Sequence, residues 1–334
     1  MHNRWHPDIA PVVTVAAGET LTLEAEDGLA GQLTRESTHA DCATLDLGLG
    51  HPLAGPVEII GAKPDDVLEV EFLEYRSADF GVTAVIPGFG FLADRFTDPF
   101  LVKWEIDDDV ARSGELPGVA VPADTFAGVV GVAPSRGRLE ELRRREERIR
   151  ERGGPVADPA PETARPRSAA GGLRTIPPRE IGGNLDIRQL VEGSRLYLPV
   201  DVPGALFSIG DLHFAQGDRR GLWNWDRGRR GGHGGTPPPR GPLPSKPFSV
   251  VRGPGATRAA LVRDDGDSRG RRDGSHRRSS RGAGRDDRPP RGDTRVPGPA
   301  AYALCSAVVD LRLSEVVDVP YPVVSALLPL DIFE

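Results

Sequence analysis

The chain has 334 residues, of which 38% are hydrophobic, 6% aromatic and 27% charged, and this length suffices for one large domain or two ordinary ones. Its 41 glycines and 32 prolines argue against a helical bundle or a coiled coil, and its two cysteines cannot form a disulfide framework. No apolar run reaches the length of about 18 residues that a membrane helix needs, and no hydrophobic leader segment follows Met1. We therefore expect a soluble, cytoplasmic protein that does not enter a membrane.

Short strands separated by glycine and proline turns dominate residues 1–135. Residues 20–26 and 67–72 alternate between apolar and polar side chains with a period of two, which is typical of strands. Glycine-punctuated apolar runs follow at 82–92, 119–121 and 126–132. The pattern predicts an N-terminal β domain, and a mainly β fold of the sandwich or barrel kind.

Residues 136–174 differ in composition and are interpreted as a charged helical insertion with a flexible linker. The sequence predicts a solvated helix over 139–152, with charge pairs spaced four residues apart and Gly153-Gly154 at its end. Its apolar side chains are too few for a core helix. Such a helix could bind a partner, but a surface insertion with a flexible tail through Gly172 is the simpler interpretation.

A second β-rich part is expected from residues 175–218 together with 300–334. Strand-like segments lie at 196–200 and 205–209. After a long interruption, the sequence predicts a short C-terminal helix over 300–307, a strand over 311–317 and an apolar segment at 323–332.

The interruption, residues 219–299, coincides with a reversal of charge. Residues 1–218 carry 21 basic and 36 acidic side chains, whereas residues 219–300 carry 20 basic and 8 acidic ones. The basic side chains of this segment are nearly all arginine, among glycine, proline and serine. It is too poor in apolar residues to offset chain entropy, so we expect disorder. Nucleic-acid binding through the arginines is the alternative.

The densest polar cluster is the string Gly210-Asp211-Leu212-His213-Phe214-Ala215-Gln216-Gly217-Asp218, directly after a predicted strand. Asp211 and His213 are two residues apart, so their side chains share a face if the segment is extended. A carboxylate and an imidazole that converge there can hold a divalent metal. A hydrogen-bonded Asp–His pair in a turn is the structural alternative.

Two further segments carry candidate side chains. Asn184 and Asp186 also share a face if extended, and Arg188 could orient Asp186 or neutralise an anion, although a structural Asp–Arg pair would look the same. Cys42, beside Asp41, is more typical of an inert core residue than of a nucleophile.

Several further motifs follow one another along the chain: His51-Pro52-Leu53-Ala54-Gly55-Pro56-Val57, Ile86-Pro87-Gly88-Phe89-Gly90, residues 128–134, 175–179, 182–188, 198–200, 203–208, 211–218, 302–306, 310–312 and 314–318. In their order and spacing these motifs resemble the acetamidase/formamidase family over residues 5–218 and 300–334. Ile181 and the run Ala307-Val308-Val309 depart from the usual family pattern. The resemblance implies a mainly β fold, hydrolysis of short linear amides to carboxylate and ammonia, and a homo-oligomer, with metal dependence in some members.

With this resemblance, we expect an amidohydrolase that acts on a small-molecule amide, such as formamide or acetamide, with metal-activated water. The ion would be divalent, either zinc or calcium. The expected catalytic residues are Asp211, His213 and Asp218. The expected metal ligands are Asp186, Asp211 and His213. The expected substrate-binding residues are Asn184, Arg188 and His51.

The sequence departs from the family after Gly217-Asp218, where the family continues Gly-Glu-Val-Cys-Gly-Thr-(Ala/Gly)-Ile-Glu. The codons of residues 219–227, read one base later, permit Gly-Glu-Val-Cys-Gly-Thr-Gly-Ile-Glu. The same offset at 261–268 permits Tyr-Val-Thr-Thr-Gly-Ile, which is also similar to a family string. We infer that residues 219 to about 299 are a frameshifted, non-native reading, with the frame restored before Tyr302.

The frameshift hypothesis predicts that the written chain lacks the family's glutamate after Gly217-Asp218, a candidate general base, and is inactive. A non-catalytic, ligand-binding β protein or the product of a damaged gene are the alternatives to an enzyme. Nucleic-acid binding loses its motivation if the arginine-rich segment is a reading in the wrong frame.

Overall fold

The computed structural model describes residues 1–90, 92–107, 109–217, 296–315, 323–329 and 331–333, together with the backbone of three short strands at 223–226, 248–251 and 261–263. These residues form several β-sheets and two α-helices, one of them near the C-terminus. The prediction of a mainly β fold with a short C-terminal helix is confirmed. In the described part of the chain, neither helix combines the length and the apolar character that crossing a bilayer demands.

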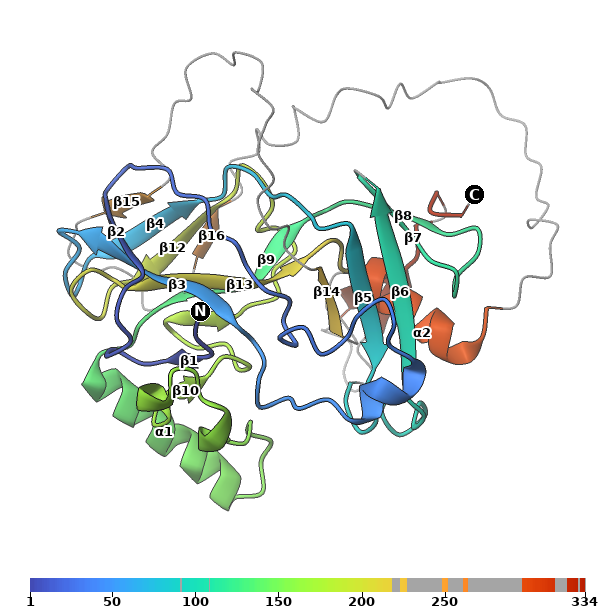
Figure 1. The fold of residues 1–334 in the computed structure, drawn as a ribbon, viewed down its shortest axis with the longest axis horizontal. Coiled ribbons are helices and arrows are strands. Elements are labelled where there is room, and N and C mark those ends of the chain that lie inside the picture. Colours follow the sequence, from blue (N-terminus) through green and yellow to red (C-terminus); the bar gives the residue numbers. More distant parts are fainter. Residues whose placement is uncertain are drawn as a thin grey trace, which may run out of the picture.

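Two sheets pack face to face around the largest core (Figure 1). Val57, Val130 and Phe207 of the first sheet share this core with Leu68 and Leu196 of the second. The first sheet has the order β11 (Gly182–Asn184), β9 (Phe126–Val132), β13 (Phe207–His213), β3 (Leu53–Ile60) and β2 (Val13–Ala16). The second has the order β15 (Phe248–Val251), β4 (Val67–Glu71), β12 (Arg195–Pro199) and β16 (Leu261–Arg263).

A third sheet lies beside this sandwich and is covered on both faces (Figure 1). Tyr302 and Leu304 of α2 (Gly298–Val308) pack on one face, and Leu29 and Cys42 of the N-terminal segment pack on the other. Phe214, which follows β13, joins the core beneath α2 and so links the two parts. The sheet has the order β14 (Trp223–Asp226), β5 (Phe80–Val85), β6 (Phe100–Asp107), β7 (Val110–Arg112) and β8 (Ala120–Pro122).

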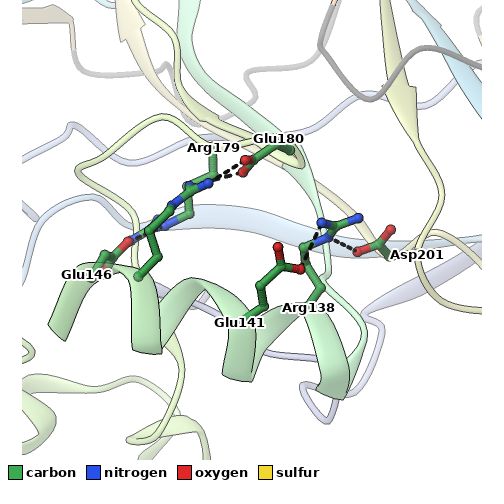
Figure 2. A network of polar contacts seen from close by, with 7 residues as sticks. Arg138, Glu141, Glu146, Arg179, Glu180 and Asp201 are labelled. Carbon is green, nitrogen blue, oxygen red and sulfur yellow. Dashed lines mark hydrogen bonds and ion pairs between the residues drawn. The ribbon is translucent and has the colours of Figure 1, made fainter. Parts of the chain in front are cut away.

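The helix α1 (Arg136–Glu151) begins at Ser135, whose hydroxyl accepts a hydrogen bond from the Arg138 amide. Leu139 and Leu142 are buried in the main core, although the sequence indicated too few apolar residues for a core helix. Ion pairs also hold this helix to the sandwich. Figure 2 shows these pairs, which are Arg138–Asp201, Arg145–Glu180 and Arg179–Glu146.

Two expectations about local order differ from the structure. Residues 20–26 form no β-ladder, although Leu21 and Leu23 do pack against the main core. The expected flexible tail instead has 3-10 turns at Pro161–Thr163 and Arg167–Ala169. It is held by the buried guanidinium of Arg4, in β1 (Arg4–Trp5), which donates hydrogen bonds to the Ala160 carbonyl and the Thr163 hydroxyl. Hydrogen bonds from a residue distant in sequence therefore order this segment, which its composition alone does not predict.

Disorder was expected throughout residues 219–299, and here the structure differs at three places. The strands β14, β15 and β16 pair with β5, β4 and β12. Short apolar stretches such as 248–251 and 261–262 suffice for pairing along an existing sheet edge. Apart from these strands and residues 296–299, the segment lies outside the described residues, as does most of the arginine-rich sequence considered for nucleic-acid binding. At the C-terminus, β17 (Asp310–Glu315) pairs with β18 (Val323–Leu327).

Candidate metal centre

The centre of the site is the end of β13, a strand flanked on both sides by β9 and β3. Asp211 and His213 both lie within this strand, and their side chains are 1% and 0% exposed. The His213 Nε2 atom is 3.4 Å from Asp211 Oδ2. The expectation that these two side chains converge is therefore met, although they sit inside the strand rather than after it.

Asp186 reaches the same imidazole from the loop after β11. The amides of Leu185 and Asp186 donate hydrogen bonds to the Gly128 carbonyl at 2.8 and 3.1 Å, which fixes this loop against β9. Asp186 Oδ1 is 3.4 Å from His213 Nε2. One ligand atom from each of Asp186, Asp211 and His213 can be chosen so that all lie within 4.8 Å of one another. Asp186 is 23% exposed, so the cluster is reached from its side.

Two glycines provide the space that this cluster occupies. A Cβ atom at Gly128 would lie 2.7 Å from His213 Nε2 and 2.8 Å from Asp186 Oδ1. A Cβ atom at Gly28 would lie 2.2 Å from Asp211 Oδ1. Cβ atoms in proteins essentially never lie closer than 3.0 Å to such neighbours, so a side chain at either glycine would force the cluster to shift. The backbone is therefore as close to the carboxylate and imidazole groups as it can be.

His51 lies at the opposite side of Asp211, with its Nε2 atom 3.8 Å from Asp211 Oδ2 and its ring fully buried. Its backbone amide donates a hydrogen bond to the Thr175 hydroxyl at 2.7 Å. The His213 ring stacks on Phe126 with centroids 4.9 Å apart, which restricts its rotation. The structure thus brings His51 to the cluster as a neighbour of Asp211.

The other expected site residues have different surroundings. Arg188 forms ion pairs with Asp124, at 3.2 Å, and with Asp310. Asn184 ends β11, and its Oδ1 atom is buried. Asp218 lies outside the described residues. Cys42 is buried, and burial raises the pKa of its thiol to about 12, which agrees with an inert core residue.

Gln216 was not singled out from the sequence, although it stands within the 210–218 string. Its side-chain amide donates a hydrogen bond to the backbone carbonyl of Asp186 at 2.9 Å, and the residue is 3% exposed. A single polar residue inside an acidic string gives no periodic signal. Only the fold, which brings Asp186 beside it, shows its position.

One imidazole nitrogen and two carboxylate oxygens are a suitable donor set for a catalytic metal, since such sites use three protein ligands and leave a position open. The imidazole favours zinc or another transition metal over calcium, which prefers oxygen ligands throughout. An apolar cavity of about 30 Å³ lies elsewhere, between the third sheet and α2, and no residue of the cluster lines it.

Comparison with known proteins adds a family to this geometry. Residues 1–220 match the model of the acetamidase/formamidase family. The chain belongs to this family. An acetamidase of Mycolicibacterium smegmatis is 35% identical over 244 residues, covering 65% of this chain and 60% of that protein. A formamidase of Methylophilus methylotrophus is 34% identical over 238 residues, covering 65% of this chain and 58% of that protein. The chain thus spans less than two thirds of the length of either relative.

A solved structure shares the fold. A gamma lactamase from Delftia acidovorans has a TM-score of 0.78 and 27% sequence identity, covering 100% of this chain and 89% of that one. The family match ends at residue 220, directly after the 211–217 segment that carries Asp211, His213 and Gln216. Every described member of the cluster therefore lies inside the matched region.

Proposed function

We propose that this protein hydrolyses short linear amides, such as formamide or acetamide, to a carboxylate and ammonia. The convergence of Asp186, Asp211 and His213 on one point is the observation that carries this proposal. Membership of the acetamidase/formamidase family and the names of its relatives support the reaction class. The lactamase relative suggests a γ-lactam as a further substrate to test.

The three side chains fit a divalent metal, with zinc favoured by the imidazole. The close approach of Gly128 to His213 Nε2 and Asp186 Oδ1 leaves these ligand atoms facing a common space that a Cβ atom would fill. When bound, the ion would polarise the amide carbonyl and lower the pKa of water.

The protein's own residues orient these groups and exclude solvent. Phe126 fixes the His213 ring, and the Gly128 carbonyl fixes the loop that carries Asp186. Asp211 is 1% exposed, so water has little access to its carboxylate, and charge interactions there are stronger than in bulk solvent. His51, next to Asp211, is placed to stabilise that carboxylate in one orientation.

Metal removal and ligand substitution test the proposal together. Ammonia release from formamide and acetamide by the frame-corrected chain should stop after treatment with a chelator and return on addition of Zn²⁺. Asp211→Asn and His213→Gln should each lower zinc affinity by at least about 10-fold, because each removes a ligand. Asp98→Asn, at an exposed carboxylate, serves as the control. Unchanged zinc affinity in both ligand variants would refute this metal centre.

The reading frame is part of the same proposal. The codon argument places the change of frame at residue 219, and the family match ends at residue 220. This coincidence supports a frameshift between two stretches of family-like sequence. Asp218, proposed as a base or ligand, and the glutamate expected after it would then stand at the point where the written sequence leaves the family.

A further inference from the structure

Gln216 is a buried polar residue for which the described part of the chain supplies a partner at only one end of the side-chain amide. Its Nε2 atom donates to the Asp186 carbonyl at 2.9 Å. A carbonyl oxygen can only accept, so this contact fixes which end of the side-chain amide is nitrogen and which is oxygen. The oxygen, Oε1, therefore points away from that carbonyl.

The Oε1 atom of Gln216 is buried and accepts no hydrogen bond from the described residues. Leaving such an acceptor unsatisfied costs about 1–3 kcal/mol, so buried acceptors are normally paired with a donor. The residue is 3% exposed, which places this acceptor out of reach of bulk water. A ligand that brings an N–H or O–H group would remove the cost.

The acceptor belongs to a residue in direct contact with the cluster. Gln216 is joined to Asp186, which is the most exposed of the three candidate ligands at 23%. Asp186 Oδ1 is in turn 3.4 Å from His213 Nε2. Gln216 thus contacts the residue that carries one of the three candidate ligands.

We propose that Gln216 Oε1 accepts a hydrogen bond from the N–H group of the substrate amide and selects amides that carry an N–H. The inference rests on the proposed function and adds a specificity-determining residue to it. A site that supplies an acceptor for a substrate N–H discriminates against analogues that lack the donor, because the acceptor is then left buried and unpaired. The carbonyl end of the substrate alone would give no such selection.

The test compares two ligands of the same shape, acetamide and acetone, in which a methyl group replaces the amide nitrogen. Dissociation constants are measured by ligand-observed NMR on the full chain loaded with Zn²⁺, and zinc affinity is measured separately. Gln216→Met should weaken acetamide binding by about 3- to 10-fold, the value of one neutral hydrogen bond, and leave acetone binding unchanged. Gln189→Met, at an exposed glutamine, should change neither constant.

Gln216→Glu separates substrate binding from a purely structural role. It keeps an oxygen acceptor but loses the donor to the Asp186 carbonyl, so it should retain the preference for acetamide over acetone. An equal preference in the wild type and in Gln216→Met, or identical behaviour of the Met and Glu variants, would overturn the assignment of Gln216. If the wild-type chain binds zinc but no acetamide, the proposed function and the inference both fail. A failure confined to the variants refutes the inference alone.

Discussion

At the scale of single residues, the site depends on two aspartates with unusual backbone conformations. Asp186 and Asp211 have φ angles of 48° and 51°, in the left-handed region. This region costs an L-residue about 1–2 kcal/mol, and aspartate is among the residues that tolerate it best. For Asp186, two amide hydrogen bonds to the Gly128 carbonyl help to offset the cost. The carboxylates are therefore positioned by the backbone as well as by their own contacts.

Gly128 offers a direct test of this geometry. In Gly128→Ala, the new methyl group would lie within 3 Å of both His213 Nε2 and Asp186 Oδ1, so at least one ligand must move. Zinc affinity should fall by at least about 10-fold, as when outer groups that orient metal ligands are changed. Isothermal titration with Zn²⁺ measures the effect. In the control, Gly114→Ala, the methyl group meets no atom within 4 Å, and zinc affinity should be unchanged. Equal zinc affinity in the Gly128 and Gly114 variants would show that the metal binds elsewhere.

At the scale of secondary-structure elements, α1 is attached to the sandwich by a buried guanidinium. The Arg179 side chain is 1% exposed, and its ion pair with Glu146 of α1 is joined by hydrogen bonds to the carbonyls of Arg174 and Pro177. Burial lowers the pKa of Arg179, and Glu146 opposes that shift. The pair therefore helps to fix the position of the helix, together with the buried Leu139 and Leu142.

Removal of this guanidinium should release the helix. Arg179→Met leaves Glu146 and two carbonyls without their donor, and we expect a loss of about 3 kcal/mol in the free energy of unfolding. Urea denaturation measures it, and a double-mutant cycle with Glu146→Gln isolates the coupling between the two side chains. Arg144→Met breaks an exposed pair with Glu140, and should cost no more than about 0.5 kcal/mol. Similar losses in both variants would contradict a special role for Arg179.

The same elements show what a sequence pattern can predict. Period-two alternation identified the strand at 67–71, a glycine-punctuated apolar run identified the strand at 126–132, and the spacing of 211 and 213 placed two candidate ligands on one face. At 20–26 the alternation correctly indicated an extended segment with one face toward the core, but this segment pairs with no neighbouring strand among the described residues. Alternation is a property of a single strand, whereas a β-sheet needs a second strand beside it. The sequence suggested Asp186 or a bound anion as the partner of Arg188, whereas Asp124 and Asp310, which pair with it, are 64 and 122 residues away. Long-range pairs leave no local signal.

At the scale of the whole molecule, the candidate centre is assembled from segments spread over the first two thirds of the chain. Gly28 and His51 come from the N-terminal part, Gly128 from β9, Asp186 from the loop after β11, and Asp211 from β13. All of them precede residue 219, at which the written sequence departs from the family. The candidate metal ligands and the family's expected glutamate thus fall on opposite sides of the proposed change of frame.

This division predicts that metal binding and turnover respond differently to correction of the frame. The written chain and a frame-corrected chain should both bind Zn²⁺ through Asp186, Asp211 and His213. Only the corrected chain regains the glutamate after Gly217-Asp218, and its ammonia release from formamide should exceed that of the written chain by at least about 100-fold, the contribution of one positioned acid–base group. Asp211→Asn in the corrected chain should abolish the gain, which ties it to this site. Equal turnover by the two chains, with resequencing of codons 215–305 in support of the written frame, would refute the frameshift and leave residues 219–299 as native sequence.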